Sequence, residues 1–278
     1  MEIGAGGYDS GFNLGDRDPM QVIRSHYRIE GNIGPWVTLI TGIANDLSMW
    51  DGQVQVLERG FRVLRYDLRG QGRTPATDPP YSIGLLVSDL AGLWDQLGIA
   101  KSHVVGLGLG GALAQAAAIE HPGRIDKLVP CCCRAQMDPE FAAMWHELIA
   151  TVKAKGLEPI VEPTAQRWFS DAFKAANPGV LDGVRKMIRG TSVSGYLGCA
   201  GAFVGLALED KLPGIKARTL YVSGAEDQRG GPPALMAGLA AKVPGARHVS
   251  VPGAAHIANI QNPAGFNRVL IDFLGEKC

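Results

Sequence analysis

The chain has 278 residues, and its 27 lysines and arginines equal its 27 aspartates and glutamates, so the formal net charge is zero. This length is enough to bury one full core with an inserted lid. The sequence has no run of lysine and arginine, which argues against nucleic acid as a partner. It also has no apolar stretch of 18 residues, which argues against a membrane span.

Residues 1–19 are rich in glycine and polar side chains and lack the basic and apolar regions of a signal peptide. We expect them to form an N-terminal arm, followed by a single domain at 20–278. Three of the five cysteines are consecutive, at Cys131, Cys132 and Cys133, which is poor material for a disulfide framework. This cysteine usage favours a reducing, cytoplasmic setting.

Short apolar runs alternate with amphipathic segments, a pattern typical of a mostly parallel sheet covered by helices on both faces. The first strand, expected at 22–31, has the character of one strand of an early hairpin. Further strands are expected at 36–41, within 61–74, at 102–108 and at 126–133. Helices are expected between them at 49–60, at 82–99 and from Gly111 to the stop at residues 121–123.

Residues 138–208 interrupt this alternation with helical segments that carry aromatic side chains. The strand pattern then resumes at 217–227 and 246–253, with helices at 232–243 and 263–277. An insertion between sheet strands is placed to cover the strand ends, where open α/β sheets bind ligands. We therefore expect a helical cap over one α/β domain.

A strand-to-helix turn reads "VVGLGLGG" at 104–111 and has Gly108 at its centre. Three other motifs lie at the ends of predicted strands. In chain order they are "YDLRGQGRT" at 66–74, "GAEDQ" at 224–228 and "VPGAAHIAN" at 251–259. Together they resemble the α/β-hydrolase family from about residue 20 to the C-terminus, with "GLGLG" in place of the G-x-S-x-G elbow. The nucleophile position, the acid and the histidine occur in the order that this family uses.

Within that family the chain most resembles 3-oxoadipate enol-lactonases and related carboxylic-ester hydrolases, through "DLSMW", "RWF" and "HIANI". The resemblance implies that Asp227 orients the imidazole of His256, which acts as general base or acid. It also implies an oxyanion hole formed by the backbone N–H groups of Leu109 and Ile43. Thr41 stands where the family usually has a histidine before this second donor, and the enol-lactonases also tend to lack that histidine.

The resemblance further implies a small, carboxylated substrate. Trp50, Trp145 and Thr41 are candidates for contact with it, although core packing is an equal alternative for the tryptophans. Arg134 could bind a substrate carboxylate through its planar guanidinium, or form a salt bridge at the strand end instead. No cofactor or metal is expected, and the glycines of "GLGLGG" lack the spacing of a dinucleotide fingerprint. A homo-oligomer is left open.

Gly108 stands where the family has its serine nucleophile. Glycine adopts strained elbow conformations freely, so the turn is expected to survive without the hydroxyl. Three hypotheses follow: a natural enzyme that needs no covalent intermediate, a serine hydrolase inactivated by substitution, or a binder without catalysis. The first includes ester or lactone hydrolysis and, as a second reaction class, decarboxylation, elimination or isomerisation of an enolisable substrate. A cysteine nucleophile is disfavoured because buried cysteine is usually a small apolar side chain.

Overall fold

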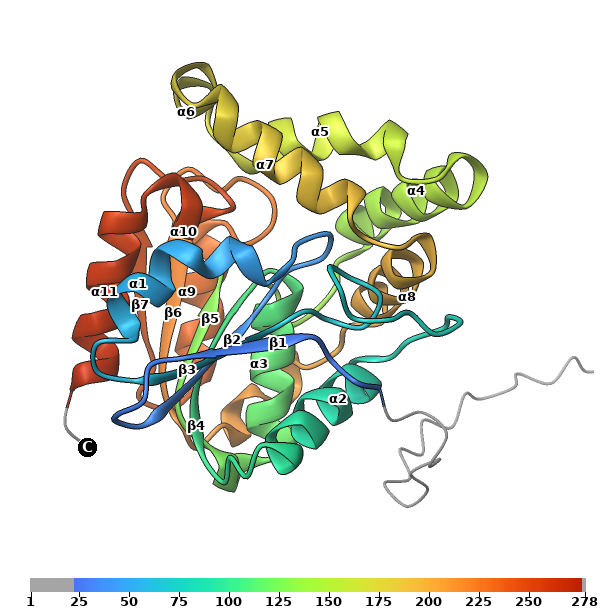
Figure 1. The fold of residues 1–278 in the computed structure, drawn as a ribbon. Coiled ribbons are helices and arrows are strands. Elements are labelled where there is room, and N and C mark those ends of the chain that lie inside the picture. Colours follow the sequence, from blue (N-terminus) through green and yellow to red (C-terminus); the bar gives the residue numbers. More distant parts are fainter. Residues whose placement is uncertain (1–22, 277–278) are drawn as a thin grey trace, which may run out of the picture.

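The computed structural model describes residues 23–276, so the predicted arm at 1–19 lies outside the described residues. The described chain folds around a seven-stranded sheet with the order β1-β3-β2-β4-β5-β6-β7 (Figure 1). All neighbouring strands are parallel except β1 and β3. The strands are β1 (Tyr27–Glu30), β2 (Trp36–Ile40), β3 (Arg62–Tyr66), β4 (Ser102–Leu107), β5 (Ile125–Cys131), β6 (Arg218–Gly224) and β7 (Arg247–Val251).

The central strand β4 is buried along its whole length, as expected for a strand covered by helices on both faces. The edge strand β7 instead has exposed positions at Arg247 and Val249. Burial of the strands therefore decreases from the centre of the sheet to its edge, which explains why continuous apolar runs predict the central strands well.

The predicted early hairpin is wrong in its pairing. β1 is present, but it pairs with β3 rather than with β2, which lies between β3 and β4. The connection from β1 to β2 passes so close to the chain before β3 that a Cβ on Gly31 would lie 2.1 Å from Phe61 O. A Cβ on Gly34 would lie 2.0 Å from Gly60 O. These glycines let the chain cross over β3 instead of turning back beside β1.

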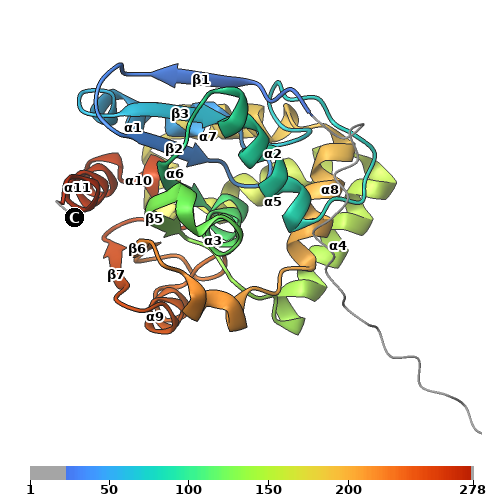
Figure 2. The ribbon, with the colours of Figure 1, turned by 90° about the horizontal axis from the view of Figure 1, so that it is seen from below.

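Helices cover both faces of the sheet, and Figure 2 shows α11 (Pro263–Gly275) and α3 (Leu109–Glu120) on opposite sides of it. The Ala-rich helix α3 packs directly on β4 and β5, and a Cβ on Gly106 would lie 2.1 Å from Gly110 O, so only glycine permits this approach. Outside the cap, the helical segments are η2 (Leu47–Trp50), α1 (Asp51–Leu57), α2 (Ile83–Gln96), α3 (Leu109–Glu120), η3 (Pro122–Arg124), η4 (Glu209–Gly214), α9 (Pro233–Lys242), α10 (Ala258–Gln261) and α11 (Pro263–Gly275).

Five helices between β5 and β6 form a cap over one end of the sheet (Figure 1). They are α4 (Pro139–Lys155), α5 (Glu158–Trp168), α6 (Asp171–Ala176), α7 (Pro178–Arg189) and α8 (Val193–Val204). The two chain segments that enter and leave the cap are paired, with Leu208 N–H donating to Ala135 O at 2.7 Å.

The start of α8 also meets the core directly. Ser192 N–H donates to Gly70 O at 3.0 Å, and a Cβ on Gly70 would lie 2.3 Å from Gly195 Cα. Core and cap therefore touch backbone to backbone at this point. Within residues 23–276, no helix is both long and apolar enough to cross a membrane.

Candidate functional site

The turn between β4 and α3 presents Gly108 with φ 60° and ψ −120°. This is a region that side chains with a Cβ enter only under strain. Gly108 N–H donates to Cys131 O at 3.0 Å, which fixes the turn against the end of β5. A Cβ built on Gly108 would have as its nearest atoms His256 Nε2 at 3.7 Å and Gly42 Cα at 3.9 Å. The turn therefore opens onto free space between the histidine and the loop that follows β2.

Asp227, three residues beyond β6, is buried and hydrogen-bonded through both carboxylate oxygens. Oδ1 accepts from the N–H groups of Arg229 and Gly230, each at 3.0 Å. Oδ2 accepts from Gly231 N–H at 2.9 Å and from His256 Nδ1 at 3.0 Å. Burial alone would raise the pKa of Asp227, but the attraction of His256 and these hydrogen bonds outweigh it and hold the pKa below its ordinary value. The carboxylate is therefore ionised at neutral pH.

His256 lies in the loop between β7 and α10, where its Nδ1 is bound to Asp227 and its Nε2 faces Gly108. One side of the ring is closed by Gly230, because a Cβ there would lie 2.1 Å from His256 Cε1. The Trp168 ring, from the cap, is centred 6.5 Å from the imidazole. These contacts leave the imidazole one free nitrogen, directed at the space beside Gly108.

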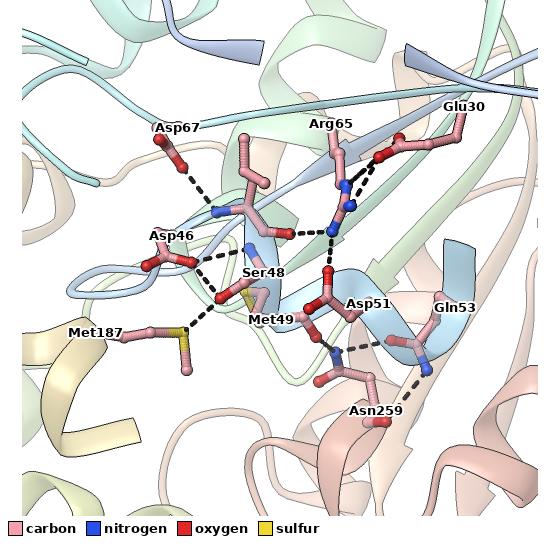
Figure 3. A network of polar contacts seen from close by, with 11 residues as sticks. Glu30, Asp46, Ser48, Met49, Asp51, Gln53, Arg65, Asp67, Met187 and Asn259 are labelled. Atoms are coloured by element: carbon pink, nitrogen blue, oxygen red, sulfur yellow. Dashed lines mark hydrogen bonds and ion pairs between the residues drawn. The ribbon is translucent and has the colours of Figure 1, made fainter. Parts of the chain in front are cut away.

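The loop after β2 carries Ile43 and is held close to the elbow, since a Cβ on Gly42 would lie 3.2 Å from Leu107 O. The segment that continues this loop is tied to the core by the polar network in Figure 3. Leu47 N–H donates to Asp67 Oδ1 at 2.7 Å, and Asn259 Nδ2 donates to Met49 O at 2.7 Å. Hydrogen bonds from two other parts of the chain therefore anchor the segment directly after Ile43.

Two cavities meet at His256. The outer one, of about 700 Å³, lies between the cap and the strand ends and reaches Asp227. The inner one, of about 60 Å³, is bounded by Gly108, Leu109 and Cys132 and has room for about two water molecules. Ile43, Trp145, Trp168 and His256 line both. The histidine therefore stands between a chamber of substrate size and a small space beside the elbow.

Of the four predicted substrate contacts, the structure brings Trp145 to the cavities and leaves three outside both. Thr41 is fully buried, and Trp50 is fully buried with its ring 6.3 Å from that of Phe266. Arg134 binds Asp138 at 2.5 Å, donates to Arg229 O and stacks over the Phe141 ring at 3.9 Å. Both terminal nitrogens of its guanidinium are therefore engaged near the base of the cap, while its Nε is buried without a partner among the described residues. The Trp145 Nε1 donor is buried and has no partner among the described residues.

Three cations that were not predicted from the sequence line the outer cavity: Arg167 on α5, Lys174 on α6 and Arg229 after β6. Lys174 is paired with Asp171 at 2.6 Å, which leaves Arg167 and Arg229. Neither forms an ion pair within the described part of the chain: Arg167 donates to Thr164 Oγ1 at 3.4 Å, and Arg229 contacts Met144 Sδ at 3.8 Å. Burial lowers the pKa of Arg167, and the like charge of Arg229 lowers it further. The "RWF" segment was visible in the sequence, but only the folded cap shows that its arginine faces the site.

Cys132 lines the inner cavity with a positive φ of 44°. Burial and the charge of the neighbouring Asp227 raise the pKa of its thiol well above the ordinary range. The thiol is therefore neutral at physiological pH, and the geometry gives no support to a cysteine nucleophile.

A family model described as the alpha/beta hydrolase fold matches residues 35–263. A 3-oxoadipate enol-lactonase of Acinetobacter baylyi is 27% identical over 262 residues, which cover 93% of this chain and 96% of that protein. Among solved structures, an enol-lactonase from Burkholderia xenovorans has a TM-score of 0.87 and 35% identity, covering 91% of this chain and 97% of its own. A thermophilic esterase from Thermogutta terrifontis, solved with malate bound, has a TM-score of 0.86 and 28% identity, covering 91% and 93%. The predicted α/β-hydrolase fold, with a mostly parallel sheet and helices on both faces, is confirmed.

Proposed function

Because the chain belongs to the α/β hydrolase fold family and is an enzyme of that family, we propose that it hydrolyses a small carboxylated lactone or ester without a covalent intermediate. The observation that carries the proposal is the free space at Gly108. A Cβ there would be 3.7 Å from His256 Nε2, and the site around it retains an ordered Asp227–His256 pair. A water molecule in this space is within reach of the free imidazole nitrogen.

In the proposed step, His256 Nε2 takes a proton from water while the water oxygen bonds to the substrate carbonyl carbon. Asp227 holds the imidazole through Nδ1 and stabilises the imidazolium that forms. The carbonyl oxygen becomes an oxyanion, which the backbone N–H groups of Leu109 and Ile43 stabilise. The intermediate then collapses, the carbon–oxygen bond to the leaving group breaks, and His256 returns the proton to the leaving oxygen. The products are a carboxylic acid and an alcohol or enol.

Two cations of the outer cavity, Arg167 and Arg229, have no ion-pair partner among the described residues, which favours a carboxylated substrate. Both guanidinium groups line the same cavity, so a substrate carboxylate bound there can accept charge-assisted hydrogen bonds from them. The likeness to enol-lactonases and to an esterase solved with malate agrees with a carboxylated ligand. Arg167 and Arg229 thus replace Arg134 as the proposed carboxylate contacts.

The test compares the chain as it stands with Gly108→Ser and His256→Ala on carboxylated lactones, enol-lactones and aryl esters in H₂¹⁸O. The proposal expects turnover by the unaltered chain, ¹⁸O in the product acid, and no acyl adduct in the mass spectrum of the quenched protein. His256→Ala should abolish this turnover. Gly108→Ser should form an acyl adduct, because the new side chain starts 3.7 Å from the base.

Other outcomes assign the chain differently. Turnover only in Gly108→Ser would indicate an inactivated serine hydrolase. Turnover of an enolisable substrate without ¹⁸O uptake would indicate a lyase or isomerase. Tight ligand binding without turnover in any variant would indicate a binder.

A further inference from the structure

Gln261, the last residue of α10, uses all four hydrogen-bonding positions of its side chain while only 8% of the residue is exposed. Oε1 accepts from Ala255 N–H at 3.1 Å and from Ser170 N–H at 3.3 Å. Nε2 donates to Gly253 O at 3.1 Å and to Ser170 Oγ at 2.6 Å. Two of these bonds reach the loop that carries His256, and two reach the cap. One side chain thus joins the two parts of the molecule that meet at the site.

The cap segment that Gln261 holds is a wall of the outer cavity. Trp168, Phe169 and Ser170 all line that cavity. The same segment touches the histidine loop a second time, because Ile257 N–H donates to Trp168 O at 3.3 Å. The wall at 168–170 is therefore linked to the loop beside His256 in two ways, through the Gln261 side chain and directly.

The other polar residue of α10 faces the core instead. Asn259 donates to Met49 O at 2.7 Å and to Gln53 Oε1 at 3.1 Å, as Figure 3 shows. The short helix after His256 is therefore anchored on two sides, to the core through Asn259 and to the cap through Gln261. Loss of Gln261 leaves the core anchor through Asn259 intact and removes the hydrogen bonds to both the histidine loop and the cap wall.

We propose that Gln261 is a positioning residue, which fixes the distance between the base His256 and the cap wall against which the substrate lies. The inference rests on the proposed function for the role of His256. Its physical basis is that the buried N–H of Ala255 and the half-buried N–H of Ser170 lose their acceptor together when the side chain is shortened. Small displacements between a base and a bound substrate reduce rates steeply, since proton transfer requires hydrogen-bond distance.

Hydrogen exchange tests the coupling without reference to turnover. Gln261→Ala is compared with Asn262→Ala, a matched control in the next residue. Asn262 caps α11 through Gly265 N–H and binds Pro252 O, both at 2.9 Å, but has no described contact with the cap. Gln261→Ala should increase exchange of the amides of Ala255 and Ser170 together, whereas Asn262→Ala should increase exchange at the start of α11 only. Increased exchange in one of the two segments alone would overturn the coupling.

Kinetics then test the positioning. Gln261→Ala should lower kcat about tenfold or more, as expected for a misplaced base, while Asn262→Ala keeps kcat within about twofold. Gln261→Glu should recover part of the loss, because its carboxylate still accepts from both N–H groups but faces Gly253 O without a donor. Equal kcat values for Gln261→Ala and Asn262→Ala would overturn the positioning role. Failure of the proposed function is distinct from this, since it appears as absence of hydrolysis in the unaltered chain.

Discussion

The two sides of the candidate site around His256 differ in how completely side chains and backbone fill them. On one side, both carboxylate oxygens of Asp227 are hydrogen-bonded and Gly230 leaves room for the imidazole only because it has no side chain. On the other side, the elbow at Gly108 offers backbone alone and an open space beside His256. The Asp227–His256 pair is thus held by several fixed contacts, whereas the elbow beside it consists of a turn of the backbone alone.

Removal of the base should have the largest effect on activity. We expect His256→Ala to lower kcat by about 10²–10⁴-fold, the usual contribution of a general acid or base, with binding of the substrate retained. His248→Ala is the control, since His248 bonds Ser223 at 2.9 Å on β6 and lines neither cavity. The measurement is steady-state kinetics on a carboxylated lactone. A decrease in kcat of less than tenfold would contradict the role of His256 as general acid or base.

Crowding the ordered side should have the next largest effect. A Cβ on Gly230 would lie 2.1 Å from His256 Cε1, so Gly230→Ala must displace the ring. We expect kcat to fall about 100-fold, the usual result of a misplacement near 1 Å. In the control Gly238→Ala, on α9, the added Cβ meets nothing within 4 Å. If both variants retain full kcat, the imidazole position on this side is not critical.

Removal of a cavity cation should act on binding rather than on the chemical step. Arg167→Met keeps most of the apolar stem and removes the charge, so KM for a carboxylated substrate should rise about tenfold or more, as for a lost charge-assisted hydrogen bond. KM for the matching methyl ester should change little. Arg134→Met is the contrast, because that guanidinium is committed to Asp138 and lines neither cavity. A larger rise in KM for Arg134→Met would restore it as the carboxylate contact.

The smallest expected effect concerns stability against pH on the ordered side. The folded-state pKa of Asp227 lies below its ordinary value, so its contribution to stability is present above the unfolded pKa, about 3.9, and is lost as pH falls through the folded value. The free energy of unfolding should therefore fall more steeply between pH 5 and pH 3 in the unaltered chain than in Asp227→Asn. Denaturant titrations at several pH values measure this slope. Equal slopes would mean that the native contacts do not favour the ionised carboxyl.

The catalytic half of the site could be predicted because its residues sit in short motifs at strand ends. "GAEDQ", "PGAAHIAN" and the elbow each follow a strand with a clear apolar pattern, and parallel strands bring their carboxyl ends to one edge. The roles of Asp227, His256, Leu109 and Ile43 remain predictions, although the structure brings all four residues to the two cavities. The pairing of β1 could not be predicted, because a crossing over β3 leaves no signal in strand periodicity.

The cap side of the site escaped prediction for a different reason. A helix pattern shows which residues share a face, but not which helix lies over the strand ends. Trp50 and Arg134 have the chemistry of binding residues, yet one is buried at the start of α1 and the other closes the base of the cap. The proposed roles of Arg167 and Gln261 depend on tertiary packing. Arg167 faces the outer cavity only because α5 lies over the strand ends, and Gln261 reaches the cap only because α10 packs against the segment after α5.

The glycine contact between Gly70 and Gly195 sets a limit on how this enzyme can be diversified. A side chain at either position would collide with backbone of the other segment, and Ser192 binds Gly70 O through both its N–H and its hydroxyl. Directed evolution toward new substrates can vary the faces of α4 and α5 that line the outer cavity. Libraries that randomise 192–195, or chimeras joined at that point, should lose correctly assembled clones faster than they gain new specificities.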